Sequence, residues 1–94
     1  MWARMVIGEC VSDEQVKQFV ELFKDSQLEL QKESSLRYSE VLMEEGGRMV
    51  IILTTWNTRE ACIQYHCSRA YRQFVARTQH LLIGDFVVKL FSTP

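Results

Sequence analysis

The first third of the chain combines a short apolar run with a longer stretch of helical periodicity. Residues 4–11 are apolar and partly β-branched, which predicts a β-strand despite Gly8. Ser12 follows, and Gln15 three residues later completes the pattern of a helix capping box. The next apolar residues share one helical face, opposite a charged face: Val16, Phe19, Val20, Phe23 and Leu30. The pattern predicts a strand followed by an amphipathic helix.

The middle of the chain has the pattern of a β-hairpin. Residues 36–43 alternate in part between apolar and polar, and residues 48–56 contain the unbroken apolar run 49–53. A short run rich in β-branched residues predicts a strand buried on both faces. Gly46 and Gly47 lie between the two segments and can adopt the positive φ that tight turns require. The two segments are therefore expected to pair.

Two helical segments are predicted after the hairpin. Asn57 or Thr58 can cap a first, short helix, and Glu60 stands where a capping-box partner of Asn57 belongs. Ser68 can cap a second helix. Its inward stripe is predicted to contain five residues: Ala70, Tyr71, Phe74, Val75 and Thr78.

The end of the chain completes the order of elements. Gly84 and Asp85 break the second helical segment, and residues 86–91 form a last strand that is apolar apart from Lys89. The order β-α-β-β-α-β is that of the ferredoxin-like arrangement. We therefore predict an α+β fold in which one domain, residues 1–94, forms a four-stranded antiparallel sheet with its helices on one face.

The third and fourth predicted strands carry apolar side chains on both faces. In the third strand, Val50 and Ile52 alternate with Ile51 and Leu53, whereas helices on one side can cover only one face. An exposed sheet face of this composition would be a larger apolar patch than monomers usually carry. The same face of a second copy could cover it. We expect a homodimer that packs through the sheet face opposite the helices.

Composition excludes several classes of partner. The formal net charge is −1, which gives no electrostatic reason to expect nucleic acid. No apolar run approaches the roughly 18 residues of a membrane span, and no charged-then-apolar leader pattern is present. The three cysteines match no metal or redox spacing. We therefore expect three free thiols in a cytoplasmic protein that does not bind a membrane.

A tryptophan at the end of the third predicted strand is followed by a set of residues at characteristic spacing: Thr58, Glu60, Ala61, Ser68 and Tyr71 after Trp56. In this pattern the chain resembles the antibiotic biosynthesis monooxygenase family of dimeric α+β barrels. The family's usual His position holds Tyr65, with His66 next to it, and its Asn four residues before the Trp is Ile52 here. The resemblance implies a cofactor-independent monooxygenase without metal or flavin, which inserts oxygen into a small phenolic or anthrone-like substrate.

Six side chains are candidates for a site between sheet and helices. Trp56 could present a flat surface and an indole donor to an aromatic ligand, or it could be a core aromatic. His66 could be a general base or a surface residue. The other candidates could bind the substrate, although each has an ordinary structural alternative: Tyr38, Tyr65, Tyr71 and Arg72.

Three functions remain open from the sequence. The first is the monooxygenase, with Trp56 and His66 as catalytic residues. The second is a dimer that binds a small ligand without chemistry, and Ile52 at the Asn position favours it. The third is a structural dimerisation domain, which a filled interior around Trp56 would favour. A pocket of roughly 300 Å³ or more beside Trp56 would favour the first two.

Overall fold

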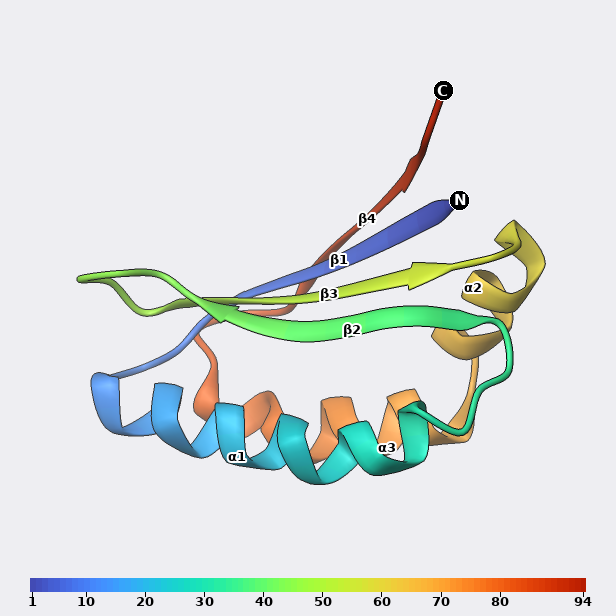
Figure 1. Cartoon of the computed structure of the whole chain (residues 1–94). Helices are drawn as coiled ribbons and strands as arrows, with labels where there is room; N and C mark the ends of the chain where they lie inside the picture. Colours follow the sequence, from blue (N-terminus) through green and yellow to red (C-terminus); the bar gives the residue numbers. More distant parts are fainter.

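One antiparallel sheet and a helical layer make up the fold (Figure 1). The computed structural model describes residues 1–94. The strands are β1 (Trp2–Glu9), β2 (Leu36–Met43), β3 (Met49–Trp56) and β4 (Val87–Ser92), in the order β2-β3-β1-β4. The helices are α1 (Asp13–Leu30), α2 (Arg59–His66) and α3 (Arg69–Thr78), and the 3₁₀ turn η1 (Gln79–Leu81) follows α3.

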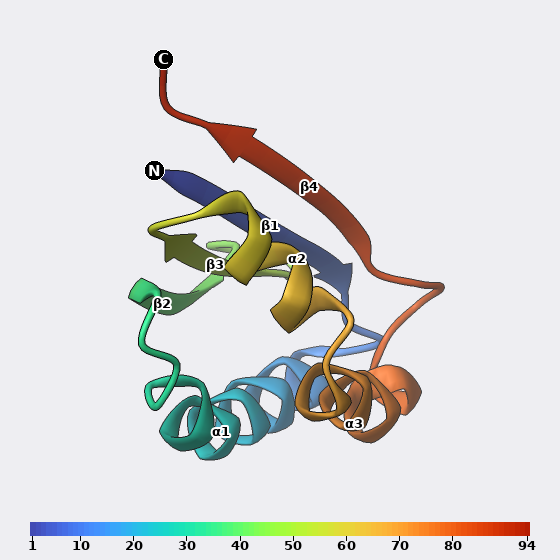
Figure 2. The ribbon, with the colours of Figure 1, turned by 90° about the vertical axis from the view of Figure 1, so that its right-hand side faces the viewer.

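The helices lie on one side of the sheet, as predicted. Helices α1 and α3 run side by side beneath it, and α2 closes one end of the space between the layers (Figures 1 and 2). The predicted ferredoxin-like α+β arrangement is confirmed. Strand β1 begins two residues earlier than predicted, and Cys10 beyond its end forms an isolated bridge with Leu82.

Three helix starts test the predicted caps. Ser12 is the N-cap of α1, but its hydroxyl bonds the Gln15 side chain and caps no backbone N–H, so the predicted capping box is wrong. Thr58 caps α2 by accepting from the Ala61 N–H. Asn57 is not the cap, because its side-chain oxygen accepts from Arg37 outside the helix. The predicted Ser68 cap of α3 is confirmed, since its hydroxyl accepts from the Tyr71 N–H.

The core lies between the sheet and the helices. The ring of Phe74 on α3 packs edge-on against Phe19 and Phe23 of α1, with centroids 5.6 and 6.2 Å apart. Trp56 has no exposed surface, and its indole N–H donates to the Thr54 hydroxyl at 2.9 Å. Ala70 is exposed, so its predicted place in the inward stripe is wrong. The aromatic contacts hold α1 and α3 together beneath β3 and β1.

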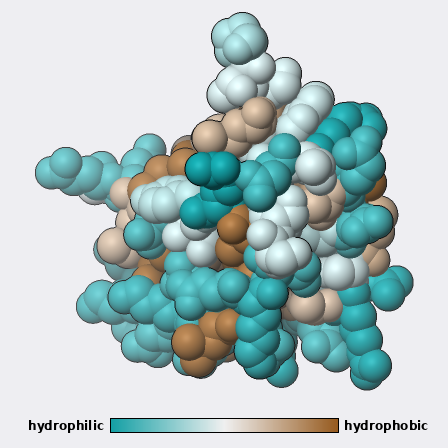
Figure 3. All heavy atoms as spheres, turned by 45° about the vertical axis from the view of Figure 1, so that its right-hand side comes forward, coloured by the Kyte–Doolittle hydropathy of each residue, from teal (hydrophilic) through white to brown (hydrophobic).

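The other face of the sheet has no helix over it. Ile7 of β1 pairs with Ile51 of β3 and with Val87 of β4, so one apolar row crosses three strands on that face. Val87 and Phe91 are 52% and 48% exposed. By contrast, hydrophilic side chains cover most of the helical layer in the lower part of Figure 3. The prediction that β3 and β4 carry apolar side chains on both faces is confirmed.

Two further predictions concern the cysteines and the membrane. All three cysteines are free: Cys10 and Cys62 are buried, and Cys67 is exposed. Burial raises the pKa of the Cys10 thiol, and burial raises that of Cys62 while the nearby Arg4 charge lowers it. None of the helices combines the length and apolar character that a bilayer crossing requires.

We predict that Trp56→Phe lowers the free energy of unfolding by about 1–3 kcal/mol, because it removes buried apolar surface and the donor to Thr54. Urea denaturation measures the change. Tyr38→Phe is the control, since Tyr38 is 51% exposed and should shift stability by less than about 0.5 kcal/mol. Equal effects of the two substitutions would contradict the buried position of Trp56.

Candidate functional site

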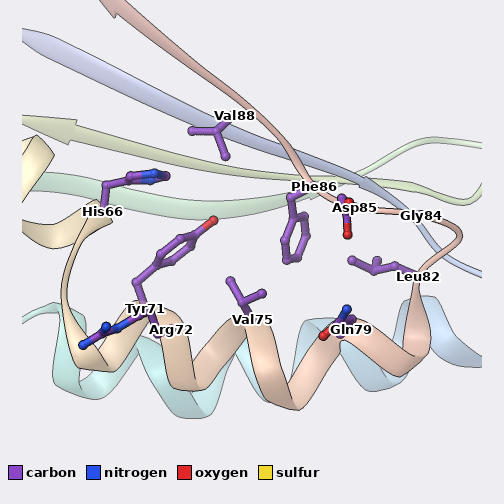
Figure 4. A pocket seen from close by; sticks show the side chains of 10 residues that line it. All are labelled: His66, Tyr71, Arg72, Val75, Gln79, Leu82, Gly84, Asp85, Phe86 and Val88. Atoms are coloured by element: carbon purple, nitrogen blue, oxygen red, sulfur yellow. The ribbon is translucent and has the colours of Figure 1, made fainter.

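A cavity of about 390 Å³ opens between α3 and the beginning of β4 (Figure 4). Its apolar wall includes Val75 of α3, Phe86 before β4 and Val88 in β4. Phe86 lies close over β1, because a Cβ atom at Gly8 would approach its ring to 3.0 Å. The volume falls within the range of about 300–1,000 Å³ that is typical of small-molecule sites.

The polar end of this cavity is formed by His66 and Tyr71. The Tyr71 side chain projects from α3 toward the sheet with its hydroxyl in the open space, and the His66 ring extends from the end of α2 above it (Figure 4). Tyr71 is buried, but its hydroxyl makes no hydrogen bond within the protein. The two rings are 5.3 Å apart and inclined by 32°. A bound molecule could therefore accept a hydrogen bond from Tyr71 while contacting the apolar wall.

Arg4 lies behind these two rings and is the residue that sequence reasoning missed. It is only 2% exposed, and its Nη2 donates to His66 Nδ1 at 2.8 Å. Its guanidinium carbon is 4.1 Å from the centre of the Tyr71 ring and 5.6 Å from that of Tyr65. Arg4 also lines a second cavity of about 200 Å³, which shares His66 and Val88 with the first. The two cavities are thus neighbours along β4.

The charge of Arg4 has no counter-ion. The two salt bridges of the chain lie elsewhere, between Lys32 and Glu29 and between Arg48 and Asp13. The bond to His66 is the only hydrogen bond of the guanidinium, and the buried Nε has no partner. The faces of Tyr65 and Tyr71 supply cation–π attraction in place of a carboxylate.

The contact with Arg4 fixes the protonation of His66. An arginine only donates hydrogen bonds, so His66 Nδ1 must be an acceptor and Nε2 must carry the proton. His66 is exposed overall, but partial desolvation of its ring, and secondarily the Arg4 charge, lower the pKa of His66 below its ordinary value. His66 is therefore a neutral ring whose Nε2–H can donate, and in this tautomer it has no free nitrogen to act as a base.

Tyr65 connects the site to the core. Its ring lies 5.3 Å from that of Trp56 and 5.8 Å from that of Tyr71. Burial raises the pKa of Tyr65, the Arg4 charge lowers it, and Tyr71 and Glu33 raise it. Tyr65 is therefore a protonated phenol whose ring packs beside the Arg4 guanidinium.

The structure brings together some of the predicted site residues and separates others. Tyr65, His66 and Tyr71 form one cluster, and exposed Arg72 lines the larger cavity. Trp56 lines neither cavity, because it is enclosed in the core behind Tyr65. The cavity of about 390 Å³ is lined by His66 and Tyr71 and not by Trp56, so the expected pocket beside Trp56 is not found there. The filled surroundings of Trp56 are what the structural alternative expects.

Tyr38 is remote from the cluster. It pairs with Thr55 on the face of the sheet that has no helix, and its side chain is 51% exposed. It therefore does not reach the cavity from its place on β2. No group of three or more His, Cys, Asp or Glu side chains is placed to hold a metal ion.

Solved structures share this architecture over nearly the whole chain. An antibiotic biosynthesis monooxygenase has a TM-score of 0.83 at 12% identity, covering 100% of this chain and 99% of its own. A monooxygenase from Streptomyces coelicolor, in complex with nanaomycin D, has a TM-score of 0.87 at 12% identity, with 99% and 87% covered. A cofactor-independent oxygenase from Streptomyces nogalater has a TM-score of 0.82 at 10% identity, with 98% and 91% covered.

These comparisons show the fold of the chain. It is the fold of the antibiotic biosynthesis monooxygenases, as the residues around Trp56 predict. No protein-family model matches the sequence, and no curated protein matches it.

We predict that the pKa of His66 in the folded protein is lower than in urea-unfolded protein, because burial and Arg4 disfavour the imidazolium. NMR titration of the ring carbons measures both values. Since the unfolded state binds the proton more readily, this group should cost stability as pH falls through the ordinary His value of about 6.5. A folded-state value equal to or above the unfolded one would show that the Arg4 contact is absent in solution.

Proposed function

We propose that this chain is a cofactor-independent monooxygenase that binds a small phenolic or anthrone-like substrate in the cavity between α3 and β4. The observation that carries the proposal is the cavity itself, where an apolar wall faces the donors of His66 and Tyr71. The shared fold with oxygenases supports it. Exposed Arg72 at the cavity could contact a polar substituent of the substrate.

The proposed chemistry uses the electrons of the substrate. An anthrone-type CH2 group loses a proton to water to give an enolate, and the enolate reacts with O2. The completed reaction converts CH2 and O2 into C=O and H2O, so no external reductant is consumed. Hydrogen bonds from His66 Nε2–H and from the Tyr71 hydroxyl would stabilise the enolate oxygen more than the neutral ketone. Trp56 does not reach the cavity and would only support the Tyr65 ring from the core.

A non-catalytic ligand-binding protein is the second candidate. Ile52, at the position where the family's oxygenases carry Asn, is buried in the core and brings no polar group to the cavity. The His66 tautomer inferred from the Arg4 contact also provides no base. In this alternative the same cavity would hold an aromatic ligand without converting it.

We predict that aerobic incubation with an anthrone consumes one O2 per substrate above the rate without protein, and that one 18O atom from 18O2 enters the product. An oxygen electrode and mass spectrometry measure this. Val75→Trp should lower kcat/KM at least about tenfold, because the indole would fill the cavity that half-buried Val75 lines.

Ala76→Trp is the matched control for this experiment. Ala76 is exposed on the same helix and lines neither cavity, so its variant should keep the wild-type rate. Binding of the anthrone without O2 uptake would overturn the oxygenase and support the ligand-binding alternative. Equal rates for the two tryptophan variants would remove the reaction from this cavity.

We also propose that two copies pack through the sheet face that carries Ile7, Ile51 and Val87, as a cytoplasmic homodimer. The three free cysteines support a reducing compartment. Each large apolar side chain that leaves water at the interface would contribute roughly 1.5–3 kcal/mol. No nucleic acid is expected as a partner, because the net charge is −1.

We predict that Val87→Glu gives monomers or aggregates, since it would place a charge in the apolar row that the proposed interface would bury. Analytical ultracentrifugation at micromolar concentration measures the mass. Leu28→Glu is the control: Leu28 is 68% exposed on α1, and this variant should remain dimeric. A monomeric wild-type protein would refute the interface.

A further inference from the structure

The Arg4 guanidinium is a buried cation for which the protein supplies no anion. A charged group that leaves water needs pairing and hydrogen bonds, and most buried charges in proteins have both. Arg4 has one hydrogen bond, to a neutral ring nitrogen, and its Nε has none. The two tyrosine faces compensate part of the lost hydration. No carboxylate of the chain pairs with Arg4, so an anionic oxygen from a ligand would be stabilised beside it.

The donors around Arg4 converge from three elements. Arg4 comes from β1, His66 from the end of α2, and Tyr71 from the beginning of α3. His66 Nε2–H and the Tyr71 hydroxyl are free to donate, and no acceptor that is part of the protein occupies them. The charged side chains that line the two cavities besides Arg4 are Arg72 and Asp85. Asp85 lies at the Phe86 end, away from His66 (Figure 4).

We propose that Arg4 is an anion-binding residue, and that the ligand spans the two neighbouring cavities as an acidic phenol or enol on a flat apolar ring, bound in its ionised form. The anionic oxygen would lie between Arg4 and the Tyr71 hydroxyl, and the ring would extend along Val88 toward Phe86. The proposal deepens the proposed function and rests on it for the place of the ligand. Beyond the proposed function, the ligand is assigned a negative charge, and Arg4 is the residue that selects this charged form.

This arrangement links recognition to reactivity. Stabilising the ionised oxygen lowers the pKa of the bound phenol or enol, so that its proton leaves to water and the electron pair stays on the conjugated oxygen. The ionised form is the one that donates electrons to O2 in the proposed reaction. Arg4 would then favour ionisation of the substrate without accepting its proton, which passes to water, since His66 has no free nitrogen in the tautomer that the Arg4 contact implies.

The test uses 4-nitrophenol, whose ionisation changes its absorption spectrum. With saturating protein, its apparent pKa should fall by at least about one unit, which corresponds to a tenfold preference for the phenolate. 4-Nitroanisole has the same ring and cannot ionise, so it should bind at least about tenfold more weakly than the phenolate. An unchanged pKa, or equal affinity for the two probes, would overturn the proposal.

Variants assign the effect to Arg4. Arg4→Met should abolish the pKa shift and leave the affinity for 4-nitroanisole unchanged, which also shows that the cavity is intact. Arg69→Met removes an exposed arginine from α3 and should keep the full shift. If Arg4→Met does not fold, Tyr71→Phe, which removes only a donor, should reduce the shift by at least half. A full shift in Arg4→Met or in Tyr71→Phe would contradict the proposal.

The carboxylate of 4-nitrobenzoate separates two sources of the anion. Binding weaker than that of the nitrophenolate supports a phenol or enol ligand, whereas tighter binding would overturn that assignment in favour of a carboxylic acid. The outcomes also separate this inference from the oxygenase. A lowered bound pKa without O2 uptake supports Arg4 and refutes the oxygenase. O2 uptake with an unchanged pKa of the bound phenol would refute anion binding by Arg4 and support the oxygenase.

Discussion

The placement of one positive charge between the sheet and the helices constrains the arrangement around it. Arg4 occupies an inward position on β1, in line with Val6 and Gly8. The chain offers it no carboxylate, and the rings of Tyr65 at the end of α2 and Tyr71 at the beginning of α3 lie against it instead. The Arg4 hydrogen bond then fixes the tautomer of His66. Arg4 therefore contacts all three aromatic side chains of the cluster.

Strand β4 connects this site to the proposed dimer interface. Val88 faces the two cavities, and its neighbour Val87 faces the uncovered side of the sheet. All six residues of β4 are exposed, including those on its inner side. A partner copy packed on the outer side would hold the strand in place and so would fix one wall of the ligand site. Dimerisation and ligand binding would then depend on the same strand.

Local patterns predict most of the fold, whereas the site depends on contacts that they do not encode. Hydrophobic periodicity and helix-capping residues locate the strands and helices. Alternation along the strands identifies the apolar face of the sheet that no helix covers. Alternation also places Arg4 inward, but nothing local reveals that His66, more than sixty residues later, becomes its partner. Strand alternation also places Trp56 on the inner face of the sheet. The sequence does not show whether an inner residue is enclosed in the core, as Trp56 is, or lines a cavity. Tyr38 follows a register shift in β2 that apolar periodicity does not show.

Arg4 and the Tyr71 hydroxyl are proposed to bind an anionic oxygen where the two cavities meet. A crystal structure with a bound aromatic phenolate tests this most directly. We expect the oxygen within about 3 Å of an Arg4 nitrogen and of the Tyr71 hydroxyl, and the ring against Val88 and Phe86. A ligand bound with its oxygen toward Arg72 or solvent, and no anion at Arg4, would contradict it.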